Sequence, residues 1–199
     1  PSRPSTLGDL VHAVEGCCAA ALAFSAPFVS GKDSLNNEYE SGLGVRQSIP
    51  PTLVITALAH VPNVDQCVSS TLRTIGSAIV MTGLTSDELR GSHLDLLLGS
   101  DHGGLVPQPD TTAPPRYQAL YELIQEGKVR SAHDCSEGGL AVALAEYCLT
   151  SPLGLNVDIR SVAATDVLAL YAESNGRILL EVDPNLVDEV CERLGLAFV

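Results

Sequence analysis

Residues 131–148 constrain the fold of this chain more than any other stretch. The first half is polar and ends in a glycine pair, Gly138 and Gly139, and the second half is apolar with the spacing of one helix face. The pattern predicts a loop that leads directly into the N-terminus of a helix. Ser136 is expected to cap that helix, because its hydroxyl can accept a hydrogen bond from an unpaired N–H group of the first turn.

Two interpretations of this loop follow from the residues alone. In the first, the backbone N–H groups of Gly138 and Gly139 stay open at the positive end of the helix and bind an anion. Asp134 then supplies a carboxylate oxygen of the kind that Mg²⁺ takes when it also binds phosphates. In the second, the glycines only permit close packing at the start of the helix. The residues alone leave both interpretations open.

His133 and Cys135 flank Asp134 and invite assignment as a Cys–His nucleophile. Such a dyad is normally assembled from distant positions in the chain, so the assignment is rejected. His133 is instead expected to pack locally and to orient Asp134.

A second glycine-containing loop lies at residues 30–34, which read Ser-Gly-Lys-Asp-Ser. Lys32 follows Gly31 and precedes Asp33 and Ser34. Its ammonium group can bind a phosphate oxygen, or it can form a structural ion pair with Asp33. From the residues alone, the ion pair is favoured.

The composition excludes several classes of function. The net charge of −13 argues against a nucleic-acid surface and against binding to an anionic membrane. The longest apolar runs, residues 17–24 and 53–59, are predicted to be too short to span a bilayer. The hydrophobic content of 45% supports a folded core. Six cysteines without a C-x-x-C pair indicate buried thiols in a reducing compartment, so a cytoplasmic protein is expected.

The periodicity predicts helices and strands in irregular alternation, which favours an α+β or mixed α/β fold over a doubly wound one. Helices are expected at residues 8–24, 85–89, 115–126, 139–148, 167–171 and 185–194, and strands at residues 52–60, 77–83, 128–132, 155–159 and 177–182. The segments 36–51 and 99–115 are expected to be loops, because they are rich in Gly, Pro and polar residues. A boundary between two units is predicted between residues 62 and 63.

The stretches 27–39 and 133–146, taken together, resemble the second synthetase half of the phosphoribosylformylglycinamidine synthase family, within the aminoimidazole ribonucleotide (AIR) synthetase superfamily. Residues 91–93 (Gly-Ser-His) and 173–177 (Glu-Ser-Asn-Gly-Arg) fit the same resemblance, which covers nearly the whole chain. The resemblance implies that residues 1–62 are the tail of a synthetase N-terminal-like unit. It also implies that residues 63–199 are a truncated AIR synthetase C-terminal-like domain.

The implied activity is that of an ATP-dependent amidoligase of de novo purine biosynthesis. Such an enzyme converts formylglycinamide ribonucleotide, ATP and glutamine to formylglycinamidine ribonucleotide, ADP, phosphate and glutamate. The implied partners are the N-terminal synthetase half, a glutaminase domain or subunit and a small-molecule substrate, with no nucleic acid and no membrane. The chain opens without an initiator methionine, so it is expected to be a fragment that is inactive alone.

Two alternatives stay open. In one, this half is a structural or auxiliary nucleotide-binding part of the same enzyme. In the other, the chain belongs to a sister enzyme of the superfamily, such as a selenophosphate or thiamine-phosphate enzyme. The Gly-Lys-Asp-Ser-Leu-Asn-Asn-Glu stretch at residues 31–38 argues against the sister enzymes.

The resemblance implies site residues, with Mg²⁺ and ATP or ADP as the bound groups. Its His-Asp-x-Ser motif implies a metal ligand at Asp134 and a nucleotide contact at Ser136. Together with the glycine pair, the expected ATP- or phosphate-binding residues are Gly31, Lys32, Ser34, Ser136, Gly138 and Gly139. Some family members have Asn in place of Lys32; a lysine cannot bind a metal, so Lys32 is expected to bind phosphate by charge. No catalytic residue is assigned, and the two loops are expected to converge on one magnesium-bound polyphosphate.

Overall fold

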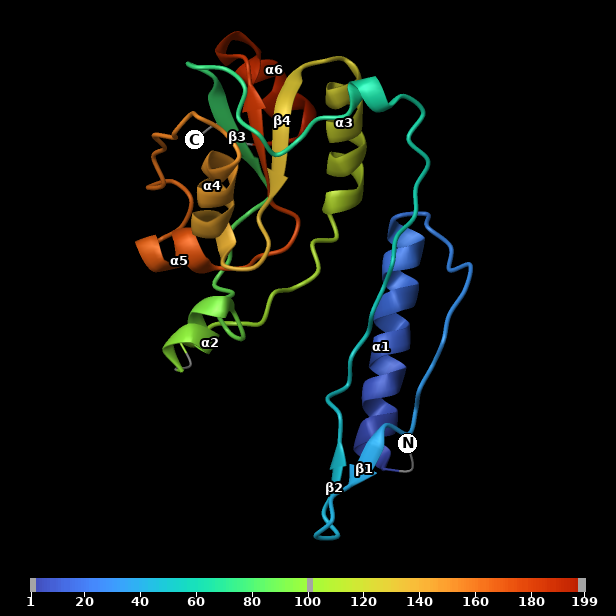
Figure 1. The fold of residues 1–199 in the computed structure, drawn as a ribbon. Coiled ribbons are helices and arrows are strands. Elements are labelled where there is room, and N and C mark those ends of the chain that lie inside the picture. Colours follow the sequence, from blue (N-terminus) through green and yellow to red (C-terminus); the bar gives the residue numbers. More distant parts are fainter. Residues whose placement is uncertain (1–2, 100–101, 197–199) are drawn as a thin grey trace. The chain divides into compact units, whose positions relative to one another are not determined.

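The computed structural model describes residues 3–99 and 102–196 and divides the chain into two compact units (Figure 1). The units are Pro1–Val61 and Pro62–Val199. Assignment of the first unit to a synthetase N-terminal-like unit stays a prediction.

The first unit consists of one helix and one short β-hairpin. Helix α1 spans Pro4–Ala23, and the hairpin pairs β1 (Glu38–Glu40) with β2 (Arg46–Ser48). Proline at the first helical position suits the start of α1, because its missing N–H group would have no partner there. None of the residues of α1 is buried, so this unit has little core of its own.

Three expectations for the first unit are wrong. Residues 52–60 form no strand and are exposed, because a strand needs a paired neighbour and this unit offers none among its described residues. Residues 36–51 are not all loop, since they contain the β1–β2 hairpin. Helix α1, with 20 residues, is long and apolar enough to cross a membrane, contrary to the expectation of no such segment. Core helices of soluble proteins have the same length and composition, so this finding alone assigns no membrane role.

The second unit is a three-stranded antiparallel sheet with helices on both faces (Figure 1). The strands are β3 (Ala78–Thr82), β4 (Val129–Asp134) and β5 (Ile178–Val182), in the order β3-β5-β4. The helices are α2 (His93–Leu98), α3 (Ala113–Gln125), α4 (Gly139–Leu149), α5 (Asp166–Tyr171) and α6 (Val187–Arg193), with 3₁₀ turns at Val64–Gln66 and Pro184–Leu186. The expected α+β, mixed α/β class is confirmed.

The two faces of the sheet bury two apolar clusters. Along β5, Leu180 and Val182 pack with α3 and α6, whereas Leu179 packs with α4, as the two-residue period of a strand requires. Tyr147 of α4 is fully buried against the second face. The structure therefore fixes α4, and the loop before it, against the sheet.

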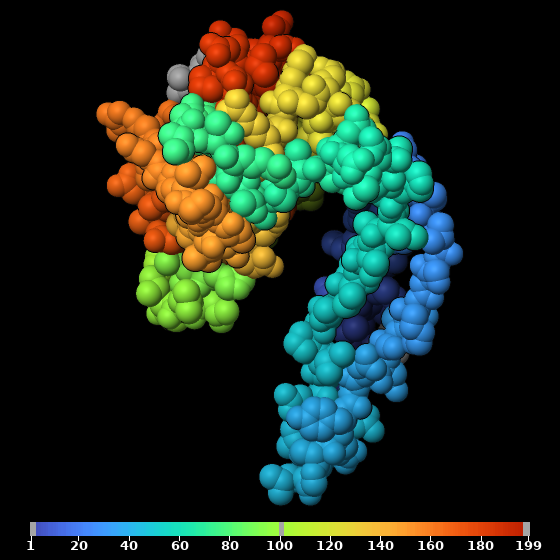
Figure 2. Space-filling view, turned by 45° about the horizontal axis from the view of Figure 1, so that its top comes forward, coloured from blue at the N-terminus to red at the C-terminus, as the bar shows by residue number. Residues whose placement is uncertain are grey.

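A buried carboxylate also holds the second face together. Glu181 of β5 accepts hydrogen bonds from the backbone N–H groups of Arg73 and Thr74 and from the hydroxyls of Ser77 and Ser131, all at 2.7–2.8 Å. Burial raises the pKa of this carboxyl, but the four hydrogen bonds outweigh that effect and lower it. Figure 2 shows the segment that precedes β3 lying across this face beside residues 150–160. The hydroxyls of Thr150 and Ser151 form hydrogen bonds to this segment.

Two expected elements of the second unit are absent. Residues 85–89 form no helix; the short helix in this region is α2, which Ser92 caps by accepting from the Asp95 N–H group. Residues 155–159 form no strand. Leu155 and Ile159 pack against the α4 cluster instead, so burial without strand pairing explains their apolar alternation.

Candidate functional site

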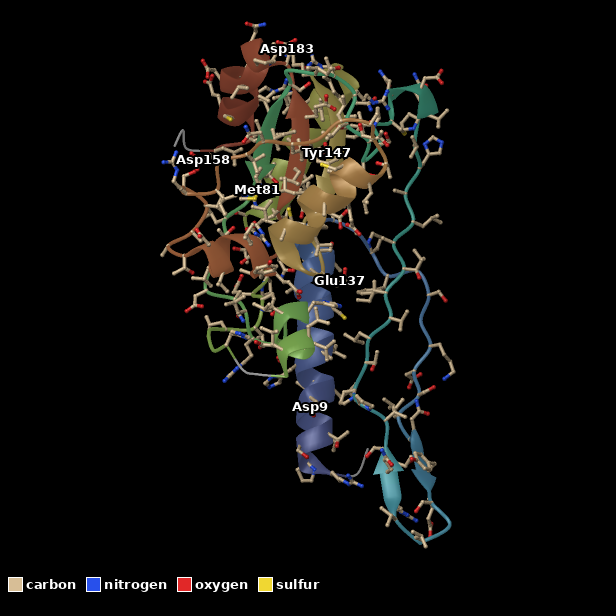
Figure 3. All side chains as sticks on the ribbon, turned by 60° about the vertical axis from the view of Figure 1, so that its left-hand side comes forward. Asp9, Met81, Glu137, Tyr147, Asp158 and Asp183 are labelled. Atoms are coloured by element: carbon tan, nitrogen blue, oxygen red, sulfur yellow. The ribbon has the colours of Figure 1, made fainter. Side chains whose placement is uncertain are left out.

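The candidate site lies where β4 ends and α4 begins. Strand β4 runs to Asp134, four residues form the turn, and α4 starts at Gly139. Burial of Cys135 and Leu140 in the apolar cluster fixes both ends of the turn, whereas the side chains of Asp134 and Ser136 stay exposed. Figure 3 shows Glu137 at one end of α4 and Tyr147 farther along the helix.

Asp134 is held as an ionised carboxylate. The Ser136 hydroxyl donates a hydrogen bond to its Oδ2 atom and, with the nearby His133, holds the pKa of Asp134 below its ordinary value. The Nδ1 atom of His133 lies 2.8 Å from the Asp134 carbonyl oxygen and 3.6 Å from its carboxylate, and Nε2 lies 3.3 Å from Glu146. The imidazole also meets the Tyr147 ring edge-on, with centroids 5.7 Å apart. His133 therefore packs locally beside Asp134, as expected.

Two expectations about the turn are wrong. Ser136 does not cap α4: the N-cap is Gly138, and the Ser136 hydroxyl bonds to Asp134 instead. The N–H groups of the glycine pair are not open either. The Gly138 N–H group donates to Glu173 Oε1 at 2.8 Å, and the Gly139 N–H group donates to the Ser136 carbonyl at 3.0 Å. A carboxylate of the protein itself thus occupies the anion position at this helix end.

Close packing accounts for both glycines. Both have a positive φ, +79° for Gly138 and +65° for Gly139. A Cβ atom on Gly139 would lie 2.5 Å from the carbonyl oxygen of Ala172, and one on Gly138 would lie 2.2 Å from Val142 Cγ2. The close packing of the second interpretation is therefore present at both glycines, and phosphate binding by these glycines stays a prediction.

A pocket of about 400 Å³ opens beside the turn. Its wall contains Asp134 and Ser136. It also contains residues for which the sequence predicts no site role, namely Pro107, Tyr117, Cys135, Glu137, Glu173, Asn175, Gly176, Arg177 and Ile178. Burial in this wall raises the pKa of the Tyr117 hydroxyl and raises that of the Cys135 thiol to about 11. A thiol with so high a pKa is a poor nucleophile at neutral pH, which agrees with rejection of a Cys–His dyad.

The sequence carried a signal for part of this wall. The Glu-Ser-Asn-Gly-Arg stretch stands out as part of the family resemblance, but nothing local reveals that its side chains reach a pocket. Tyr117 lies at a helical spacing that predicts a core position, and the structure places it partly in the pocket wall.

The carboxylate of Asp134 can bind a hard cation such as Mg²⁺ only if other ligands complete the coordination. Among residues 3–99 and 102–196 there is no cluster of three or more His, Cys, Asp or Glu side chains that could hold a metal ion by themselves. Mg²⁺ in nucleotide sites usually takes one or two carboxylates, with phosphate and water oxygens as its other ligands. The exposed, ionised carboxylate of Asp134 fits that donor set, with the nucleotide expected to complete it.

The first unit holds the other predicted residues. The Lys32 ammonium contacts the carbonyl oxygen of Asp33 and lies 2.9 Å from the Ser34 hydroxyl. No ion pair with the Asp33 carboxylate is present in this described loop, so that interpretation is wrong. Gly31 has open space where a Cβ atom would lie. The convergence of Gly31, Lys32 and Ser34 with Asp134 on one ligand stays a prediction.

A second hollow lies along α6, between Asp188, Glu189, Glu192 and Leu196. Its lining is three carboxylates and one leucine, without the hydroxyl and amide groups of the pocket at Asp134, and it has no hydroxyl paired with a carboxylate as Ser136 is with Asp134. The pocket at Asp134 is therefore the candidate site.

Comparison with known proteins assigns the family. Residues 74–197 match the family described as AIR synthase related protein, C-terminal domain, and this region is more than half of the chain. The chain belongs to the AIR synthase-related family. The expected relationship to the AIR synthetase superfamily is thereby confirmed, and every pocket residue named above lies within the AIR synthase-related region.

Individual AIR synthase-related relatives match almost the whole chain. This chain is 33% identical over 196 residues to the phosphoribosylformylglycinamidine synthase subunit PurL of Limosilactobacillus reuteri. The match covers 98% of this chain and 25% of that protein. The PurL subunit of Methanocaldococcus jannaschii is 33% identical over 205 residues, covering 100% of this chain and 28% of that protein. The chain thus spans about a quarter of the length of these relatives.

Solved structures share the fold. T. maritima PurL complexed with FGAR matches with a TM-score of 0.57 and 23% identity, over 66% of this chain and 24% of that one. T. maritima PurL complexed with AMPPCP matches with a TM-score of 0.53 and 23% identity, over 66% of this chain and 21% of that one. At this identity the likeness supports the AIR synthase-related fold.

Proposed function

We propose that this chain is part of a phosphoribosylformylglycinamidine synthase, the ATP-dependent ligase that converts formylglycinamide ribonucleotide, ATP and glutamine to the amidine, ADP, phosphate and glutamate. The N-terminal synthetase half, a glutaminase domain or subunit and a cytoplasmic location are part of the same proposal. Its support is the 33% identity to PurL subunits over 98% of the chain. The observation that carries the site is the ionised Asp134 carboxylate, paired with Ser136 at the mouth of a pocket.

The roles of individual residues follow from their chemistry. Asp134 is proposed as a ligand of Mg²⁺, and Ser136 as a contact to the nucleotide while it holds Asp134 ionised. When bound, Mg²⁺ would neutralise part of the charge of the phosphate groups. The exposed Lys32 is proposed to bind a phosphate oxygen, because its partners among the described residues are a carbonyl and a hydroxyl, neither of which carries a negative charge.

The pocket wall explains why a metal is part of this proposal. Three of its side chains, Asp134, Glu137 and Glu173, are carboxylates, and the cation on the wall, Arg177, is buried and bonded to protein groups. A polyphosphate without a cation would be repelled by such a wall. Nucleotide binding at this pocket is therefore expected to depend on Mg²⁺.

Isothermal titration with Mg-ADP and with ADP alone tests the assignment. Weak binding of Mg-ADP and none of metal-free ADP is expected, without turnover by this chain alone. Asp134→Ala is expected to reduce the affinity at least about ten-fold, and Lys32→Ala by a smaller factor, whereas Glu192→Ala on the distant α6 serves as the charge control. Unchanged binding by Asp134→Ala would overturn the site, and unchanged binding by Lys32→Ala would remove the first loop from it.

A structural or auxiliary nucleotide-holding role in the same enzyme is the second candidate. It is favoured by one observation: the N–H groups of Gly138 and Gly139 are already satisfied by protein oxygens. Complementation of a purine auxotroph by the complete gene separates the candidates. Normal growth with the Asp134→Ala gene would favour the structural role, and loss of growth the productive one. Failure of the unmutated gene to complement would point to a sister enzyme.

A further inference from the structure

The turn at residues 173–177, between α5 and β5, bonds to a distant segment at almost every position. Ser174 Oγ accepts from the Ser86 N–H group at 3.0 Å, and Asn175 Nδ2 donates to the Gln108 carbonyl at 2.9 Å. Arg177 Nη1 donates to Thr85 Oγ1 at 3.0 Å. The partners lie in the 85–108 segment, whose described residues are 85–99 and 102–108, so this turn bonds to both ends of the segment that carries α2 and ends at the pocket wall.

The glycine of this turn lies against Asp110, two residues beyond that segment. A Cβ atom on Gly176 would lie 2.6 Å from Asp110 Oδ2, and the φ of Gly176 is +80°. The guanidinium of Arg177 is buried, and its other bonds go to the carbonyls of Ala172, at the C-cap of α5, and of Ser174 in the turn. Buried polar groups that are fully bonded make a turn rigid, and this one is held against the 85–108 segment.

Glu173 extends these contacts to the candidate site. Its Oε1 atom accepts from the N–H group of His93, the first residue of α2, at 2.8 Å and from the N–H group of Gly138, the N-cap of α4, at 2.8 Å. Its side chain is only 15% exposed, and it lies on the pocket wall. One carboxylate oxygen thus joins the 85–108 segment to the turn that presents Asp134 and Ser136.

We propose that Glu173 is a positioning residue, whose carboxylate fixes the turn at residues 134–138 to the N-terminus of α2 so that Asp134 and Ser136 stay in place on the pocket wall for a magnesium–nucleotide ligand. This inference rests on the proposed function for its ligand, but not for its geometry. Two N–H groups on one charged oxygen make strong hydrogen bonds, and neither helix end has that anion without Glu173.

A matched pair of substitutions at His93 tests the connection. Proline is well tolerated at the first position of a helix, and Ser92, with φ −68° and ψ 165°, already has the extended backbone that a residue before proline requires. The Nδ1 atom of the His93 imidazole also lies 3.3 Å from Glu173 Oε1. His93→Pro therefore removes both the N–H donor and the imidazole, whereas His93→Ala removes only the imidazole, so the difference between the two variants reports the N–H bond. We expect His93→Pro to weaken Mg-ADP binding several-fold and His93→Ala to weaken it clearly less. Equal effects of the two variants, or no effect of either, would overturn the proposal.

Hydrogen exchange gives a readout that needs no ligand. Glu173→Ala is expected to speed amide exchange both at residues 92–98 and at residues 136–140, whereas Glu173→Gln, whose amide oxygen can accept both bonds, restores most of the protection. Faster exchange in only one of the two segments would contradict the inference. If the unmutated protein bound no Mg-ADP, the proposed function would fail, and the exchange result would still decide whether Glu173 couples the turn at residues 134–138 to α2.

Discussion

The hydroxyl of Ser131 on β4 donates a 2.8 Å hydrogen bond to the carboxylate of Glu181 on the central strand β5, inside the face of the sheet that α4 covers. The same hydroxyl lies 2.8 Å from the phenol oxygen of Tyr147. This contact joins the sheet, the helix of the candidate site and, through the other bonds of Glu181, the segment before β3.

Glu181→Gln is expected to destabilise the protein by about 2–4 kcal/mol. Glutamine presents an amide N–H₂ group where at least one N–H donor now points, so a buried donor loses its acceptor. Urea denaturation measures the change. Glu192→Gln, which removes an exposed carboxylate on α6, is expected to stay within about 0.5 kcal/mol, and a similar small effect for Glu181→Gln would contradict the role given to this network.

Gly139→Ala is expected to lower the free energy of unfolding by more than the backbone strain of a positive φ alone would. Gly127 supplies the matched control, because its φ of +72° is close to the +65° of Gly139 but nothing lies within 4 Å of a Cβ atom there. Gly127→Ala is expected to cost about 1–2 kcal/mol, and Gly139→Ala about 1–3 kcal/mol more, from overlap with the Ala172 carbonyl. Equal free energies of unfolding for the two variants would mean that the packing explanation of the glycine pair is wrong.

The contribution of Glu126 to stability should vanish in acid. Arg193 and Lys128 lower the pKa of this carboxyl from 4.5 to about 2, with Arg193 the larger cause. A lowered folded-state pKa stabilises the fold above the unfolded-state pKa, and that stabilisation is lost as pH falls from about 4.5 to about 2. The difference in Tm between the unmutated protein and Glu126→Gln should therefore be present near neutral pH and absent at about pH 2. Glu15→Gln on α1 is the control, and a difference independent of pH would contradict this account.

Cys135 should resist alkylation in the folded protein. It is buried, and burial raises the pKa of its thiol to about 11, whereas Cys18 and Cys67 are exposed. Mass spectrometry after brief treatment with iodoacetamide at neutral pH is expected to show modification of Cys18 and Cys67 and protection of Cys135, with the protection lost in urea. Modification of Cys135 at the rate of the exposed thiols would reopen the question of a nucleophile beside His133.

The sequence predicts those elements whose local pattern and long-range packing agree. Strands β3 and β5 and helices α3 and α4 are of this kind, since their apolar periodicity matches the two clusters that they bury. The strand prediction fails at residues 155–159, because the apolar side chains of an alternating run can be buried equally well by packing without strand pairing. It also fails at 52–60, where β-branched residues alone cannot make a strand without a neighbour.

The candidate site, too, is predictable from the sequence only in part. Asp134 and Ser136 are identifiable from a short motif, but the residue at which α4 begins is not. With Gly138 at the N-cap, Ser136 lies two residues before the cap position, and its hydroxyl donates to Asp134. The roles of Ser174 and Asn175 depend on partners 88 and 67 residues away, which no local pattern specifies. Roles that depend on such distant partners emerge only from the folded chain.

The order β3-β5-β4 has a consequence for synthesis on the ribosome. The central strand of the sheet is the last to be made, and Val182 pairs with Ala78 across more than half of the chain. Until residues 178–182 leave the exit tunnel, β3 and β4 have no strand between them and the clusters on both faces lack their middle layer. A nascent chain stalled before residue 178 would therefore present two unpaired strands to chaperones, and folding of the second unit would be a late, single event.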